Sequence, residues 1–190
     1  MPNPEIFVVA GPNGAGKSTG ATAILPKRFP TDRFLNADDI ARALATDSRV
    51  EAGKVMLRRM HKLRKHRETF AFETTLAGRS HARLLQEARQ SGYRIHLAYV
   101  WLCSVELAKK RVAGRVQDGG HDVPAADIER RYWRGMKNLF KLYLPLANRW
   151  ALCDNSGKKL FVVARGRMGE EPTIYDPQRF DRIRHAAGQD

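Results

Sequence analysis

Cysteine, acidic side chains and long apolar runs are all scarce in this sequence of 190 residues. The two cysteines, Cys103 and Cys153, lie in separate apolar, strand-like runs and lack the spacing of metal ligands, which predicts two buried, reduced thiols. No apolar run approaches the roughly 20 residues that cross a bilayer, and no basic-then-apolar signal segment opens the chain. We therefore expect a soluble, cytoplasmic protein without a membrane partner.

The shortage of acidic residues leaves a large positive charge. The 34 lysines and arginines outnumber the 20 aspartates and glutamates, which gives a net charge of +14. Such a surplus favours anionic partners, among them nucleotides, sugar phosphates, nucleic acids and acidic proteins, without choosing between them. The chain shows no repeat and no linker, so residues 1–190 are expected to form one domain, with a polar tail that frays from about Asp176.

A glycine-rich segment follows the apolar run Ile6–Ala10. Its GxxxxGK[ST] pattern is typical of a phosphate-binding loop, in which backbone N–H groups turn inward around the phosphates. In such a loop Lys17 reaches the β- and γ-phosphates of ATP, and the hydroxyl of Ser18 ligates Mg²⁺. The predicted ATP-binding residues of the loop are Gly11, Pro12, Asn13, Gly14, Ala15, Gly16, Lys17, Ser18 and Thr19.

Strand-like apolar runs alternate with helix-like stretches along the whole chain. This alternation is typical of βαβ units and predicts an α/β fold of the P-loop NTPase and kinase type, with three layers and a mostly parallel central sheet. The predicted strands are Ile6–Ala10, Arg33–Asn36, Thr69–Phe72, Ile95–Leu102, Trp150–Cys153 and Leu160–Val163. The predicted helices are Gly20–Leu25, Asp38–Ala45, 50–67, Ser80–Ser91, Val105–Val116 and Ala126–Leu144.

Two carboxylates follow predicted strands. Asp38 comes after the second strand and Glu73 after the third, and parallel strands bring their carboxyl ends, where ligands bind, to one edge of the sheet. Phosphoryl transfer to an alcohol needs a carboxylate that accepts the hydroxyl proton. We therefore expect Asp38 to be the general base and Glu73 to orient the acceptor or the Mg²⁺ shell. The alternatives are structural: Asp38 or, more readily, Asp39 would cap the next helix, and Glu73 would be a surface charge.

The segment 111–124 has the features of a lid. Arg111 and Arg115 lie four residues apart and share one helix face, and the Gly-Gly pair that follows them provides a hinge. A closing arginine supplies the positive charge that the γ-phosphate needs in the transition state. We expect this role for Arg115.

Other charged residues of the lid region have two interpretations. Arg131 would contact the ATP phosphates or else form an ion pair with Asp127, and His121 would hydrogen-bond a phosphate or else be structural. The remaining arginines of the two lid helices are more readily explained as a solvated face; they are Arg111, Arg130 and Arg134.

Two further segments have a ligand-binding and a structural interpretation. The run 154–157 follows the fifth strand, where an adenine ring could rest against Asn155, but Asn-Ser-Gly also suits a plain turn. The basic helix 54–67 would attract a polyanion or an acidic partner, although a solvated face explains it equally well and no aromatic residues alternate with its charges.

Several of these blocks recur together in a known order. They are Gly11–Thr19, Asn36–Ala41, Phe72–Leu76, Gly92-Tyr93, Arg111–Pro124 and Asp154–Gly157. Together they resemble the zeta-toxin family, specifically its shorter branch often labelled "predicted ABC-type ATPase", from about Ile6 to Val163. The resemblance implies a P-loop kinase fold with a lid, and phosphorylation of the 3′-hydroxyl of the sugar in UDP-N-acetylglucosamine with ATP and Mg²⁺. It also implies a small antitoxin as a protein partner, which here would be acidic.

The resemblance assigns roles to individual positions. It implies Lys17 as the loop lysine, Asp38 as the catalytic aspartate, Glu73 and Thr75 as contacts of the acceptor, and Arg115 as the first lid arginine. The second lid arginine of the family falls on His121, and the arginine that follows the family's substrate threonine has no match at Ala77, with Arg79 the nearest candidate. These two departures lie where lid and acceptor meet, so they leave the acceptor open.

Three functions therefore compete. The leading one is a small-molecule kinase of zeta-toxin type, with UDP-N-acetylglucosamine as the first acceptor to test. The second keeps the fold and changes the acceptor to a nucleoside, an antibiotic hydroxyl or a polynucleotide end. The third is a nucleotide-dependent switch or ATPase that associates with nucleic acid, which is disfavoured because such a switch does not need two carboxylates at neighbouring strand ends.

Overall fold

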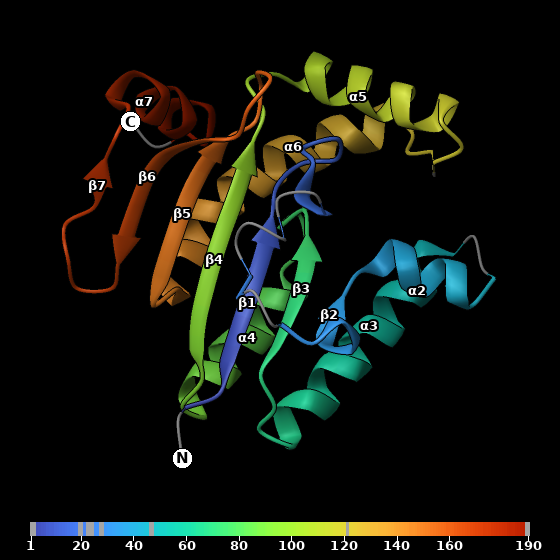
Figure 1. Ribbon diagram of the computed structural model, residues 1–190, viewed down its shortest axis with the longest axis vertical. Coiled ribbons are helices and arrows are strands. Elements are labelled where there is room, and N and C mark those ends of the chain that lie inside the picture. Colours follow the sequence, from blue (N-terminus) through green and yellow to red (C-terminus); the bar gives the residue numbers. More distant parts are fainter. Residues whose placement is uncertain are drawn as a thin grey trace.

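A mostly parallel sheet of seven strands organises the fold, in the order β2-β3-β1-β4-β5-β6-β7 (Figure 1). The computed structural model describes residues 3–18, 21, 25–26, 29–45, 48–120 and 122–188. Strands β1 to β5 are parallel, whereas β6 is antiparallel to both of its neighbours. The strands are β1 (Glu5–Ala10), β2 (Phe34–Leu35), β3 (Phe70–Thr74), β4 (Arg94–Trp101), β5 (Arg149–Asp154), β6 (Phe161–Arg167) and β7 (Thr173–Ile174). The predicted fold class is confirmed.

The helices lie on one face and around the edges of this sheet. Figure 1 shows α4 and α6 behind the strands, α2 and α3 beyond the β2 edge, and α5 above the strand tips. They are α2 (Ala37–Ala43), α3 (Arg49–Lys65), α4 (Ser80–Gln90), α5 (Val105–Gln117), α6 (Ala125–Asn138) and α7 (Pro177–Ala186). Short helical turns are η1 (Thr31–Arg33), η2 (Leu139–Tyr143) and η3 (Leu144–Leu146). The predicted helix Gly20–Leu25 falls largely outside the described residues.

The direction of β6 follows from the length of the connection before it. Only residues 155–160 separate β5 from β6, whereas a parallel crossover needs about a dozen residues or more. The chain therefore turns back and pairs antiparallel. β7 then adds a short pairing with Ala164 and Arg165 at the edge of the sheet.

The C-terminal residues contradict the expectation of a fraying tail. Asp176 caps α7, because its carboxylate accepts a hydrogen bond of 2.9 Å from the Arg179 backbone N–H. Ile183 of this helix is fully buried, and the Arg179 guanidinium lies 3.0 Å from the Asp154 carboxylate at the end of β5. Sparse apolar spacing concealed this helix in the sequence, but one buried isoleucine and an ion pair hold it on the sheet.

Alternation along the strands decides which side chains reach the ligand edge. The register pairs Val8 with Phe72 and Val9 with Glu73, so neighbouring residues of β3 face opposite sides of the sheet. Phe72 faces the main core behind the sheet, which contains Leu84 of α4 and Met136 of α6. Glu73 consequently points to the other face, beside the start of the phosphate loop.

The two cysteines differ from each other, contrary to the expectation that both are buried. Cys153 lies in β5 and is buried, and this burial raises the pKa of its thiol to about 11. Cys103 lies just after β4 and is exposed, because the strand ends at Trp101, before the apolar run does. None of the helices in the described part of the chain is long and apolar enough to cross a membrane.

Candidate active site

The glycine-rich segment leaves β1 and passes very close to its neighbours. A Cβ atom on Gly11, whose φ is +149°, would lie 2.2 Å from the carbonyl oxygen of Val100 in β4. A Cβ on Gly16, whose φ is +76°, would lie 2.9 Å from Nδ2 of Asn155. Both positions therefore require glycine for space and for backbone conformation. The loop begins helical geometry at Lys17 and Ser18, which turns backbone N–H groups toward an anion site.

Lys17 is the buried cation of this loop. Its side chain is 7% exposed, its Nζ donates a hydrogen bond of 2.9 Å to the carbonyl oxygen of Pro12, and it lies 3.5 Å from Glu73. Burial lowers the pKa of Lys17, and the neighbouring charge of Glu73 opposes this effect. A poorly solvated ammonium group gains most from additional negative charge, so the site is suited to phosphate.

The Glu73 carboxylate joins three elements of the site. It accepts hydrogen bonds from the Ser18 hydroxyl at 2.7 Å and from Nδ2 of Asn36 at 3.3 Å, in addition to its ion pair with Lys17. Its side chain is 14% exposed, so it is not the surface charge that the structural alternative describes. The sequence interpretation did not select Asn36, although it follows β2 by the same strand-end criterion that selects Asp38.

Asn36 also corrects the expected capping of the second helix. Its Oδ1 accepts a hydrogen bond of 2.8 Å from the Asp38 N–H and caps α2. Neither Asp38 nor Asp39 is the cap, and Asp39 pairs with Arg42 instead. Asp38 is exposed in the first turn of α2, and within the described residues no hydrogen bond or ion pair engages its carboxylate.

The candidate acceptor residues follow β3. Thr75 is half-buried and Arg79 is exposed just before α4. The intervening Thr74 faces the other side of the sheet, where its hydroxyl lies 3.1 Å from Nδ1 of His81 and accepts a hydrogen bond from the Leu76 N–H. Burial lowers the pKa of His81 to about 4, so this imidazole is neutral at pH 7. Its contact with Thr74 stabilises the turn that follows β3.

The lid helices α5 and α6 are linked by an ion pair of 2.7 Å between Lys109 and Glu129. Arg115 near the end of α5 is exposed, and its charge contributes to lowering the pKa of Lys17, after desolvation. Arg131 of α6 instead lies 3.4 Å from Asp127, as its structural alternative describes. Arg115 thus remains the predicted phosphate-facing arginine, and the ion pair supports the structural alternative for Arg131.

The loop after β5 reaches the phosphate loop directly. Nδ2 of Asn155 donates a hydrogen bond of 2.9 Å to the carbonyl oxygen of Ala15. Arg111 of α5 lies within 3.4 Å and 3.5 Å of the Ser156 and Gly157 carbonyl oxygens. The sequence favours a solvated face for Arg111, because a position on a helix does not reveal which loop the side chain contacts. The structure brings Arg111 to the proposed adenine side of the site.

Hard oxygen donors are present where Mg²⁺ is expected. The Ser18 hydroxyl and the Glu73 carboxylate are oxygen ligands of the kind that Mg²⁺ takes together with phosphate oxygens and water. The described residues contain no group of three or more His, Cys, Asp or Glu that could hold a metal by themselves. The residues present therefore fit a metal that arrives with the nucleotide. Two other candidates, Thr19 and His121, lie outside the described residues.

Solved structures share this fold at low sequence identity. A chain of the AvrRxo1-ORF1:AvrRxo1-ORF2 complex, solved with ATP, gives a TM-score of 0.78 at 17% identity over 95% of this chain. This chain spans only 63% of that one. A chain of the PezAT toxin-antitoxin system of Streptococcus pneumoniae gives a TM-score of 0.65 at 18% identity, over 100% of this chain and 80% of that chain. These likenesses establish the P-loop fold.

Sequence comparison identifies the family. An uncharacterized protein of Haemophilus influenzae is 30% identical over 139 residues, which cover 70% of this chain and 94% of the relative. The sequence model of AAA_33, described as an AAA domain, matches residues 6–140. This range runs from β1 through the phosphate loop, both strand-end carboxylates and the lid helices. The chain therefore belongs to the AAA domain family.

Proposed function

We propose that the protein is an ATP-dependent kinase of zeta-toxin type, which transfers the γ-phosphoryl group of ATP to a hydroxyl of a small-molecule acceptor. The observation that carries the proposal is the different placement of two carboxylates beside one phosphate loop. Glu73 is held by Lys17, Ser18 and Asn36, whereas Asp38 is exposed and its charge still acts on Lys17. A nucleotide switch needs the first carboxylate only.

The pinned carboxylate organises the phosphate side of the reaction. Glu73 orients the Ser18 hydroxyl and keeps Lys17 beside the loop. ATP phosphates would draw Lys17 away from the Pro12 carbonyl oxygen, to which its Nζ donates a hydrogen bond. Mg²⁺, when bound with ATP, supplies charge neutralisation at the β- and γ-phosphates.

The exposed carboxylate suits the acceptor side. Asp38 accepts the proton of the attacking hydroxyl, a role that requires an acceptor oxygen within hydrogen-bond reach and not already engaged. Arg115 at the end of α5 adds positive charge to the γ-phosphate as it is transferred. Closure of the part of α5 that carries Arg115 excludes water, which would otherwise compete with the acceptor.

The proposed acceptor rests on the resemblance to zeta toxins and on the residues of the turn after β3. Thr75 and Arg79 lie on the turn after β3, where an acceptor would meet Asp38. UDP-N-acetylglucosamine is the first candidate, since its diphosphate suits a site with a net positive charge. The complexes of the AvrRxo1 and PezAT proteins also support an antitoxin-like protein as a partner of this chain.

Phosphorus NMR tests the proposal directly. The protein is incubated with ATP, Mg²⁺ and UDP-N-acetylglucosamine, and compared with two variants, Asp38→Asn and Asp39→Asn. A new sugar-phosphate resonance is expected in the wild type and in Asp39→Asn, because Asp39 only pairs with Arg42. It should fall about 10²- to 10⁴-fold in Asp38→Asn, the range for loss of a general base.

Each other outcome has a definite meaning. An ester signal that survives in Asp38→Asn would exclude Asp38 as the base. ADP and free phosphate without an ester would mean that the acceptor is another hydroxyl compound, and nucleosides and polynucleotide ends would be tested next. Absence of any ATP turnover with all of these acceptors would overturn the kinase assignment.

A further inference from the structure

A cavity of about 430 Å³ lies toward the β7 edge of the sheet. Its lining comes from β5, β6 and β7 and from the residues that follow β6 and β7. The phosphate loop follows β1, and β4 lies between β1 and β5 in the sheet (Figure 1). The cavity is therefore separate from the candidate active site.

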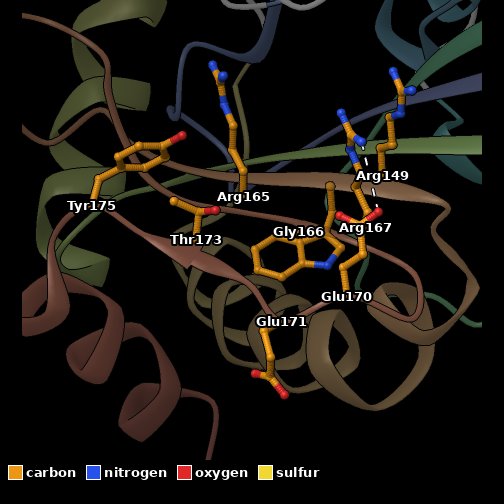
Figure 2. A pocket seen from close by; sticks show the side chains of 9 residues that line it. Arg149, Arg165, Gly166, Arg167, Glu170, Glu171, Thr173 and Tyr175 are labelled. Carbon is orange, nitrogen blue, oxygen red and sulfur yellow. Dashed lines mark ion pairs between the residues drawn. The ribbon is translucent and has the colours of Figure 1, made fainter.

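Three arginines beside the cavity share one face of the sheet. The antiparallel register pairs Arg149 with Arg167 and Ala151 with Arg165, so alternation puts all three guanidinium groups on the same side of β5 and β6. All three side chains are exposed. Figure 2 shows them extending in a common direction. We call the surface formed by Arg149, Arg165 and Arg167 the arginine face.

Little negative charge opposes the arginine face. Glu170 lies 3.9 Å from Arg167, and their side chains are 61% and 59% exposed. An exposed pair at this distance contributes little, because water screens it. Figure 2 shows the Glu171 carboxylate pointing to the opposite side from the guanidinium groups. The arginine face thus retains a positive potential that favours an anionic ligand.

An aromatic ring lies beside these charges. Tyr175 lines the cavity just after β7 and is 53% exposed. An aromatic ring next to arginines provides a stacking surface for an unpaired base, while the arginines follow the phosphates. Trp150 packs against Gly166, and alternation puts both of them on the opposite face of the strands from the arginine face.

Helix α3 forms another strongly basic surface, but it lacks the combination of arginines with an aromatic ring. Helix α3 is basic along its exposed side, but it contains no phenylalanine, tyrosine or tryptophan. Its exposed cations include Lys54, Arg58, Arg59, Lys62 and Lys65. Charge alone attracts any polyanion. A recess with an aromatic ring and arginines selects a ligand that carries both bases and phosphates.

We propose that the arginine face and its cavity bind single-stranded nucleic acid. Phosphates lie on the three arginines, and one base stacks on the Tyr175 ring in the cavity. The cavity volume is within the roughly 300–1,000 Å³ of small-molecule sites, which suits one unstacked base. This function is additional to the kinase reaction and does not depend on it.

Fluorescence anisotropy with a labelled single-stranded oligonucleotide, without ATP, tests the proposal. The double variant Arg165→Gln/Arg167→Gln should bind more weakly, and the slope of log K against log salt should fall by about 0.7 for each lost phosphate contact, or about 1.4 in all. The matched control Arg58→Gln/Arg59→Gln removes the same charge from α3 and should bind like the wild type. Equal weakening of the two double variants would overturn the proposal.

The base contact is tested at Tyr175. Tyr175→Ala should weaken binding of the oligonucleotide about tenfold, the effect of losing one stacked base, whereas Tyr175→Phe keeps the ring and should bind normally. Heparin has charge but no bases, so its binding should not distinguish Tyr175→Ala from the wild type. An unchanged affinity of Tyr175→Ala, or a duplex that binds as tightly as the single strand, would contradict the proposal.

Saturating ATP and Mg²⁺ provide the last control. They should leave the oligonucleotide bound, because β4 lies between β1, which leads into the phosphate loop, and the strands of the arginine face. Displacement by ATP would place the strand at the phosphate loop and overturn the proposal. No turnover is measured in these experiments, so a failure of binding at the arginine face and a failure of kinase activity are separate results.

Discussion

The phosphate loop and the arginine face are both positively charged, but they are built in opposite ways. Lys17 is 7% exposed and meets Glu73 at 3.5 Å, inside a network that joins β1, β2 and β3. Arg167 is 59% exposed and meets Glu170 at only 3.9 Å, on an open antiparallel edge. One region encloses a single cation among carboxylates, and the other displays several cations to solvent.

This difference in burial distinguishes charges that can act in catalysis from charges that only attract a ligand. Burial lowers the local dielectric, so the charges around Lys17 act strongly and only in a fixed geometry. Charges on the arginine face act through water and salt, so they draw an anion in without fixing an individual atom. Positive side chains thus contribute to the net charge of +14 in two different ways. Only an enclosed charge such as that of Lys17 can stabilise a transition state.

The largest expected effect is on turnover after loss of the buried cation. Lys17→Met should lower kcat/KM for ATP-dependent transfer by about 10²- to 10³-fold, the usual cost of one electrostatic contact to the transition state. Arg165→Gln should leave it unchanged, since that charge lies on β6, and β4 and β5 separate β6 from β1. Steady-state ADP release measures both. A similar loss in the two variants would mean that the two regions do not act separately.

The free energy of unfolding should depend on pH through His81, which contacts Thr74 at the end of β3. The pKa of His81 is depressed from 6.5 to about 4 by burial, so the unfolded chain binds its proton first as the pH falls. Stability from the neutral imidazole is complete above about pH 6.5 and is lost toward pH 4, by about 3 kcal/mol in all. Urea unfolding of wild type and His81→Gln between pH 7 and pH 4 should reveal this difference. Parallel pH profiles for the two proteins would contradict it.

Glycine substitutions compare the packing around β6 with that around α5. Gly166→Ala places a methyl group against the Trp150 indole, with 2.3 Å available, and should destabilise the protein by about 1–3 kcal/mol. Gly114→Ala in α5 meets nothing within 4 Å and should instead stabilise by about 0.5–1 kcal/mol, because it lowers the entropy of the unfolded chain. Thermal unfolding distinguishes the two signs. A stabilised Gly166→Ala would mean that the indole is not packed on the strand.

The sequence predicted the parts of the site that depend on local pattern. The spacing of the phosphate loop and the order of strands and helices require no long-range information, and both predict the parallel sheet. Period-two alternation also puts Glu73 on the face of the loop, apart from Thr74. The roles of these residues remain predictions until the kinetic experiments are done.

What the sequence could not show depends on contacts between distant segments. Asn155 meets Ala15 across 140 positions, and the ion pair of Arg179 with Asp154 that holds α7 also joins separate elements of the chain. The choice of Asn36 as a cap depends on competition with Asp38 and Asp39, which propensity leaves nearly equal. The arginine face arises only when β6 folds back on β5, because Arg149 and Arg165 are far apart in the chain.

The smallest expected effect comes from the two thiols, which test the separation of the regions directly. Cys103 is exposed and its backbone N–H donates to the Ser156 hydroxyl at 2.8 Å, beside the loop that carries Asn155. Cys153 is buried with a pKa raised to about 11, so only Cys103 should react with an aromatic disulfide at pH 8 in the folded protein. ATP with Mg²⁺ should slow this reaction a few-fold by ordering the loop, and Cys103→Ser should abolish it. A single-stranded oligonucleotide should leave the rate unchanged, because its site lies on the arginine face, separate from the phosphate loop. Equal protection by both ligands would show that they share one site or that binding at either site orders the other. In that case the comparison between a closed catalytic site and an open binding surface would fail.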